Sequence, residues 1–128
     1  MTKERKQKQV AEIAQLLEGA TGIYSIDFTG LTVAEAIRLR REFRKAGVVY
    51  KVAKNTLIKR ALADNENFSG VAERFVGQTG IAVGYDDPAM PARVLKEFID
   101  PKVEIPKLNF AVLETTVFEG SQLKELAA

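Results

Sequence analysis

The 128-residue chain is 46% hydrophobic and carries a formal net charge of +2, which suits one domain with an ordinary core. It contains neither cysteine nor histidine; this excludes disulfides, thiolate-ligated metals and Ser-His or Cys-His catalytic pairs, and it favours a reducing, cytoplasmic location. No apolar run reaches the roughly 20 residues that a membrane span requires, and the charged N-terminus has no apolar stretch typical of a secretory signal.

The first predicted element is a helix over residues 2–18. Its second half carries one apolar stripe at i, i+3, i+4, i+7 spacing, made of Val10, Ile13, Ala14 and Leu17. Its first two turns instead carry the basic residues Lys3, Arg5, Lys6 and Lys8. At about 100° per residue these side chains point all round the axis, which a helix lying flat on a core cannot accommodate. We therefore predict that this end projects as a basic arm.

A strand and a second helix follow. Alternation over Gly22–Phe28 predicts the strand. Thr32 and Glu35 form a Ser/Thr-x-x-Glu capping box that begins the helix, and Gly47 is placed to end it. The basic residues between Arg38 and Lys45 are typical of either a solvated helix face or an RNA contact.

The next strand, over residues 48–53, leads through the turn Lys54-Asn55-Thr56 into a third helix. Asn55 is predicted to cap that helix, and its outward side carries Thr56, Lys59 and Arg60. A helix N-terminus offers unpaired N–H groups and about half a positive charge, and Lys54, Lys59 and Arg60 add full charges. The turn is thus predicted to bind phosphate; the alternative is a capped, solvated helix.

The remaining pattern predicts a short helix at 71–75, a strand at 81–85, a helix opening at Asp87-Pro88, strands at 110–113 and 115–118, and a last helix from Ser121. The order of elements favours the α/β (α+β) class. We expect a two-layer sandwich resembling a split βαβ plait, with a mixed sheet of about four to five strands and helices packed against it. A doubly wound three-layer fold is the second choice.

Charge is divided unevenly along the chain. Residues 1–60 hold 13 Lys and Arg against 6 Asp and Glu, whereas residues 61–128 hold 6 against 11, so the two parts carry +7 and −5. This asymmetry indicates a polyanionic partner on one side, or else solvated surface charge. Nucleotide loops of the GxxxxGK[ST] or GxGxxG type do not occur. Asp86-Asp87 is explained by helix capping more simply than by a metal, so we expect no catalytic residues, no metal and no cofactor.

Four motifs are similar to the bacterial stalk-base protein of the large ribosomal subunit, the L-ten family. They are SIDFTGLTVAEAIRLRREFRKAGV, VAKNTLIKRAL, FVGQTGIAV and PARVLKEF, and the resemblance spans essentially all of the chain. It implies a structural, non-catalytic protein that binds large-subunit ribosomal RNA at the GTPase-associated centre. It also implies a neighbouring L-eleven family protein and a role as the base of the stalk that recruits translation factors.

The resemblance implies RNA contacts at the arm, Lys3 to Lys8, and at the Lys54-Asn55-Thr56 turn; Lys59 and Arg60 are added by the helical-face argument. Gln78 stands where the family commonly has proline. The family continues into a long helix that carries acidic L-seven/L-twelve dimers, whereas this sequence ends at Ala128. We therefore expect 1–128 to be a single ribosomal-RNA-binding domain, with stalk dimers as partners only where that helix is present.

Two rival functions come from other classes of protein. One is a free-standing regulatory domain that binds a protein through its acidic half. The other is a small phosphate-handling enzyme that uses the start of the Asn55 helix as its anion site.

Overall fold

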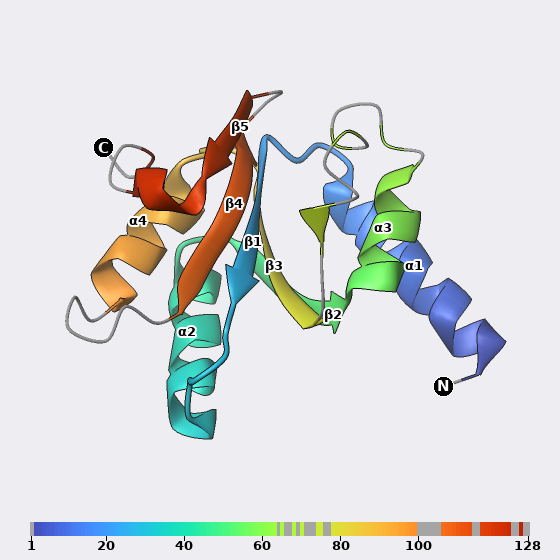
Figure 1. Cartoon of the computed structure of the whole chain (residues 1–128), viewed down its shortest axis with the longest axis horizontal. Helices are drawn as coiled ribbons and strands as arrows, with labels where there is room; N and C mark the ends of the chain where they lie inside the picture. The colour runs from blue at the N-terminus through green and yellow to red at the C-terminus, as the bar shows by residue number, and fades with distance from the viewer. Residues whose placement is uncertain are drawn as a thin grey trace.

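The computed structural model describes residues 2–63, 65, 68, 70, 74–75, 78–99, 106–113, 116–123 and 126, without the side chains of 78 and 79. A five-stranded sheet with strand order β2-β3-β1-β4-β5 lies between helices (Figure 1). In chain order the elements are α1 (Lys3–Leu17), β1 (Gly22–Asp27), α2 (Val33–Lys45), β2 (Val49–Lys54), α3 (Asn55–Ala63), β3 (Gln78–Gly84), α4 (Met90–Phe98), β4 (Lys107–Leu113), β5 (Thr116–Glu119) and the 3-10 helix η2 (Gly120–Gln122).

The sheet confirms the α+β class and the split βαβ arrangement. Strands β1 and β2 are joined through α2, and β3 lies between them, antiparallel to both. On the other side β1 pairs antiparallel with β4, so that Tyr24 lies between Ala82 and Ala111. Every neighbouring pair among these strands is antiparallel, and the expected mixed sheet was therefore wrong. The reason is that the α2 crossover skips one strand position, which β3 then fills.

The predicted two layers were also wrong, because helices cover both faces of the sheet. Helices α1 and α3 lie on one face, and α2 and α4 on the other (Figure 1). The first core includes Ile13, Leu17, Ile58, Leu62, Phe75 and Phe110; the second includes Tyr24, Ile26, Leu39, Phe43, Ala92 and Leu95. Even the polar residue Ser25 in β1 is covered: it is 2% exposed, and its Oγ accepts a hydrogen bond from Asn109 Nδ2 at 3.4 Å.

The predicted ends of α2 are confirmed. Thr32 Oγ1 accepts from the Glu35 amide at 3.1 Å, and Glu35 Oε1 accepts from the Thr32 amide at 3.0 Å, which completes the capping box. The hydrogen bond that the Thr32 amide donates to the Glu35 carboxylate favours the ionised form and lowers the pKa of Glu35. After Lys45, Gly47 takes a φ of 75°, the left-handed conformation expected just beyond a helix end.

Two other predicted helices differ from the structure. Helix α4 begins at Met90, because Asp87 Oδ1 accepts from the Ala89 amide at 3.0 Å in a turn that precedes it. The last helix, expected from Ser121, opens with a 3-10 turn at Gly120–Gln122, and Leu123 and Leu126 beyond that turn are helical. Most of the helix predicted at 71–75 lies outside the described residues.

Unfolding at alkaline pH should coincide with ionisation of the buried tyrosine side chains. Burial raises the pKa of Tyr24, Tyr50 and Tyr85, the only three tyrosines in the chain. Because each pKa is higher in the folded state than its ordinary value of about 10, their contribution to stability is complete below pH 10 and is lost as pH rises through the folded values. Absorbance at 295 nm should show tyrosinate forming together with loss of circular dichroism; tyrosines that ionise near pH 10 in a folded protein would contradict this.

Candidate nucleic-acid interface

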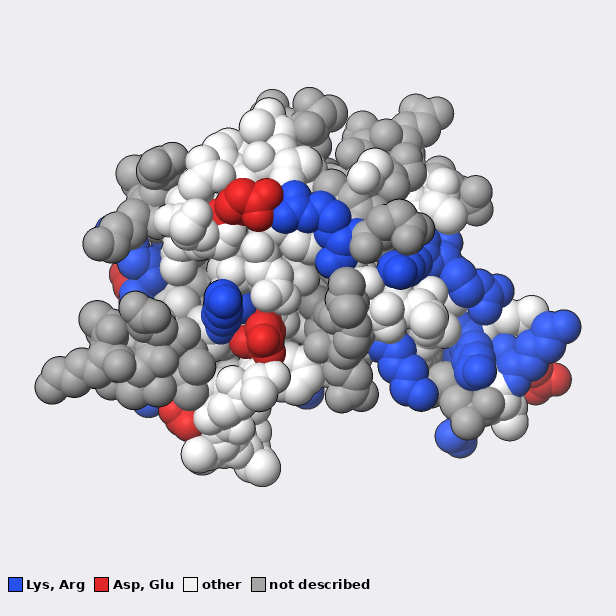
Figure 2. All heavy atoms as spheres, viewed as in Figure 1, with Lys and Arg blue, Asp and Glu red and all other residues white. Residues whose placement is uncertain are grey.

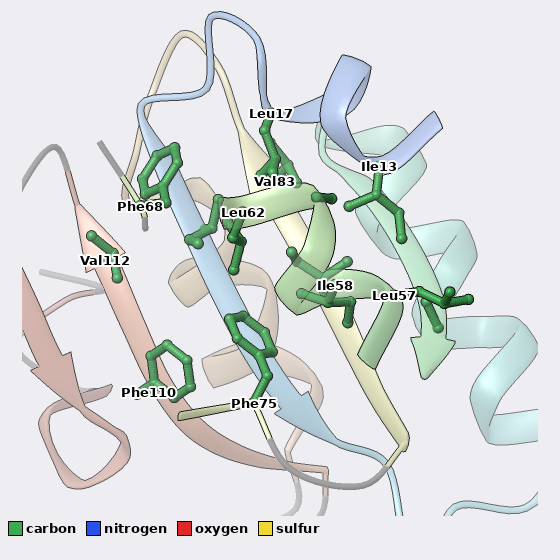
Figure 3. Close-up of a cluster of buried hydrophobic side chains, with 14 residues drawn as sticks. Ile13, Leu17, Leu57, Ile58, Leu62, Phe68, Phe75, Val83, Phe110 and Val112 are labelled. Atoms are coloured by element: carbon green, nitrogen blue, oxygen red, sulfur yellow. The ribbon is translucent and has the colours of Figure 1, made fainter. Parts of the chain in front are cut away.

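The predicted phosphate-binding turn lies where β2 runs directly into α3. Strand β2 ends at Lys54 and α3 begins at Asn55, with no residue between them. Leu57, Ile58 and Leu62 point from α3 into the core on the sheet (Figure 3). This fixes the rotation of the helix and leaves Thr56 and Arg60 exposed; Lys54, at the end of β2, is exposed as well. Lys59 is half-buried and is already engaged in an interaction within the chain.

Asn55 does not cap the helix as predicted. It is the first helical residue, and its Nδ2 donates to the Phe75 carbonyl oxygen at 3.2 Å. Phe75 is fully buried and packs edge-on against Phe110, with ring centroids 5.1 Å apart (Figure 3). The amide thus ties the start of α3 to the segment at 74–75, across 20 residues of sequence. No local sequence signal predicts this bond, because the carbonyl that accepts it belongs to a distant backbone position.

Asn55→Ala should lower the free energy of unfolding by about 1 kcal/mol, the usual contribution of one partly buried hydrogen bond. Urea unfolding followed by circular dichroism measures the loss. Thr56→Ala is the matched control, because Thr56 is adjacent and exposed; it should change stability by less than about 0.5 kcal/mol. Equal effects of the two substitutions on the free energy of unfolding would show that the Asn55–Phe75 hydrogen bond does not stabilise the fold.

The basic arm is the exposed start of a continuous helix. Thr2 Oγ1 accepts from the Arg5 amide at 3.2 Å and caps α1. The buried residues of α1, Ile13 and Leu17, both lie in its second half. Lys3, Arg5, Lys6 and Lys8 are all exposed. The first turns therefore have no role in the core, as the charge pattern indicated.

The fold brings the arm and the turn to one side of the molecule. Helix α1 packs on α3, and Lys51 Nζ in β2 pairs with Glu12 Oε2 at 3.1 Å. The N-terminal ends of α1 and α3 lie towards the same end of the molecule (Figure 1), and Figure 2 shows Lys and Arg side chains gathered over this part. We call the exposed cations here the basic surface; they are Lys3, Arg5, Lys6, Lys8, Lys54 and Arg60.

Arg74 is a further cation that the sequence did not single out. Its guanidinium group lies 4.6 Å from the centroid of the Phe110 ring and bonds both carboxylate oxygens of Glu119, at 2.9 and 2.7 Å. Because Glu119 neutralises it, Arg74 is a weaker candidate for binding an anion than the free cations of the basic surface.

Asp87, half of the acidic pair considered for a metal, is used within the protein. One carboxylate oxygen accepts from the Ala89 amide and the other pairs with Arg93. These hydrogen bonds, first that from Ala89, lower the pKa of the carboxyl group. Within the described residues no group of three acidic side chains is placed to hold a metal ion. None of the helices described has the length and apolar character of a membrane span.

An α+β scaffold whose described residues form an extended basic surface is typical of a protein that binds a polyanion. Comparison with known proteins agrees. The family described as Ribosomal protein L10 matches residues 1–100. Large ribosomal subunit protein uL10 of Chlorobium phaeobacteroides is 44% identical over 127 residues, which are 99% of this chain and 73% of that protein. The protein of the same name from Prosthecochloris aestuarii is 44% identical over 128 residues, covering 100% and 74%, respectively.

The chain belongs to the ribosomal protein L10 family, which confirms the resemblance noted in its motifs. It is a constituent of the large ribosomal subunit, and so of a ribonucleoprotein that carries out translation. The family is structural and not enzymatic. The rival readings, a free-standing regulatory domain and a phosphate-handling enzyme, are therefore set aside.

Proposed function

We propose that this protein binds large-subunit ribosomal RNA at the GTPase-associated centre through its basic surface, with 1–128 acting as one RNA-binding domain. The observation that carries the proposal is the set of four exposed cations round the first two turns of α1, beside the basic start of α3. Packing does not explain cations on every side of a helix. Contact with a folded RNA does, because its phosphates can approach the arm from several directions.

The start of α3 adds a second kind of attraction. Its first N–H groups and the positive end of the helix dipole favour an anion, and Lys54 is exposed beside this end. Arg60 is exposed further along, in the last turn of α3. Thr56 supplies an exposed hydroxyl that can donate to a phosphate oxygen. Asn55 contributes by holding the helix start against Phe75, and Lys59 through its charge.

Bound in this way, the protein forms the base of the stalk that recruits translation factors, in the bacterial cytoplasm and beside an L-eleven family protein. Membership of the ribosomal protein L10 family is what supports these proposed partners. Acidic L-seven/L-twelve dimers are partners where the long helix of the family follows the RNA-binding domain.

Binding to a GTPase-centre RNA fragment across a salt series tests the proposal. If about five phosphates are neutralised, the logarithm of affinity should fall with the logarithm of salt concentration with a slope of roughly −3.5 to −4.5. Lys54→Ala should lower the magnitude of that slope by about one. The matched control is Lys96→Ala, the same change of charge at an exposed position of α4 on the other face of the sheet; it should leave the slope unchanged.

Filter binding gives the affinities, and circular dichroism checks that each variant is folded. A folded variant lacking Lys54, Lys59 and Arg60 that keeps both the affinity and the slope would contradict a phosphate site at α3. The start of that helix would then be a solvated surface.

A further inference from the structure

The outer side of α2 exposes apolar groups without an evident structural reason. Val33 is 78% exposed and Ile37 is 54% exposed. Both are β-branched, a type that slightly disfavours helix formation, so neither helix stability nor core packing explains them. Isolated apolar residues are common on protein surfaces, but these two lie at i, i+4 and are neighbours on one side of the helix.

Exposed arginines lie on the same side of α2, after Val33 and Ile37 in the chain. Arg38 stacks over the Phe98 ring at 4.5 Å from its centroid, and Lys45 pairs with Glu42 at 3.6 Å. The other three basic residues of the helix are Arg40, Arg41 and Arg44. All three are exposed, and within the described part of the chain none has a hydrogen bond or an ion pair.

Helical geometry brings these five residues together. At about 100° per residue they fall within a sector of roughly 100°. We call this sector the α2 stripe; it consists of Val33, Ile37, Arg40, Arg41 and Arg44. Both glutamates of the helix lie outside it, since Glu35 belongs to the capping box and Glu42 pairs with Lys45. The stripe therefore joins an apolar end to an uncompensated positive end.

We propose that the α2 stripe is a docking site for an acidic segment of another protein in the large ribosomal subunit. Carboxylates of that segment pair with the arginines, and its aliphatic side chains cover Val33 and Ile37. RNA complements the arginines but leaves the apolar end against a polar backbone, so a protein fits the whole stripe better.

The site is independent of the proposed RNA-binding function. Helix α2 covers the face of the sheet opposite α1 and α3 (Figure 1), so the stripe and the basic surface belong to different sides of the molecule. Both can be occupied at once, and each can be tested without the other.

Photo-cross-linking in large ribosomal subunits that contain the full protein tests the docking site. p-Benzoylphenylalanine is placed at Ile37 in one variant and at Lys6 in another. The Ile37 probe should cross-link to a net acidic peptide of another ribosomal protein, identified by mass spectrometry. Products with RNA alone, products with a net basic peptide, or no product at all from Ile37 would overturn the proposal. The Lys6 probe reports on RNA binding only, so its failure would count against the proposed function and not against the docking site.

Charge reversal tests the complementarity. Arg41→Glu with Arg44→Glu should reduce the yield of the Ile37 protein cross-link about fivefold, because two exposed ion pairs are replaced by repulsion. Arg41→Lys with Arg44→Lys should retain most of the yield. Both variants change only exposed positions of α2, so circular dichroism should show that they remain folded. An equal yield from the charge-reversed protein would overturn the proposal of an acidic partner.

Discussion

Replacing Lys3, Arg5, Lys6 and Lys8 together by alanine should lower the affinity for a GTPase-centre RNA fragment on the order of a thousandfold at about 0.1 M salt. Each cation that neutralises a phosphate releases counterions, so losing four such contacts should also reduce the magnitude of the salt slope by about three. Alanine favours helix, and these side chains have no place in the core, so α1 should persist. Filter binding across a salt series measures both quantities.

Four cations on the opposite face provide the control. Replacing Arg40, Arg41, Arg44 and Lys45 by alanine changes the net charge equally, but the substitutions lie on α2. This variant should keep its salt slope within about one unit of the parent protein. If the two variants lost affinity equally, general charge attraction rather than a defined surface would account for RNA binding.

Phe43→Ala should lower the free energy of unfolding by about 3–5 kcal/mol, the usual range for removing a fully buried phenylalanine. The Phe43 side chain is 0% exposed and stacks on Tyr50, with ring centroids 5.2 Å apart and an interplanar angle of 26°. Alanine leaves a cavity between α2 and the sheet and removes this ring contact. Urea unfolding monitored by circular dichroism measures the change.

Phe43→Leu is the matched control for that cavity. It keeps most of the buried volume and should cost clearly less than alanine. Because Phe43 lies on the face opposite the basic surface, the alanine variant should bind RNA normally wherever it remains folded. A loss below about 1.5 kcal/mol, or equal losses for alanine and leucine, would mean that this core collapses around the missing ring.

Most of the helices and strands, and the exposed cations of the basic surface, could be predicted from the sequence alone. Helix and strand periods, the capping box at Thr32 and Glu35, and the glycine after α2 depend on residues within a few positions of one another, so they are readable locally. Cations all round the start of α1 were likewise recognisable as exposed, because no apolar side remained for a core. The family resemblance rested on motifs of the same local kind.

Only the tertiary structure decided how these parts are arranged. The insertion of β3 between β1 and β2 depends on pairing between strands far apart in the chain, and it made the sheet antiparallel. The second helical layer depends on burial of both sheet faces, including Ser25, whose hydroxyl is satisfied by Asn109. The sequence did not predict the hydrogen bond of Asn55 to Phe75 or the ion pair of Arg74 with Glu119, because the partners in each pair are distant in sequence and are brought together only by the fold. Contacts between distant segments are set by the packing of the whole chain, and a local pattern does not contain them.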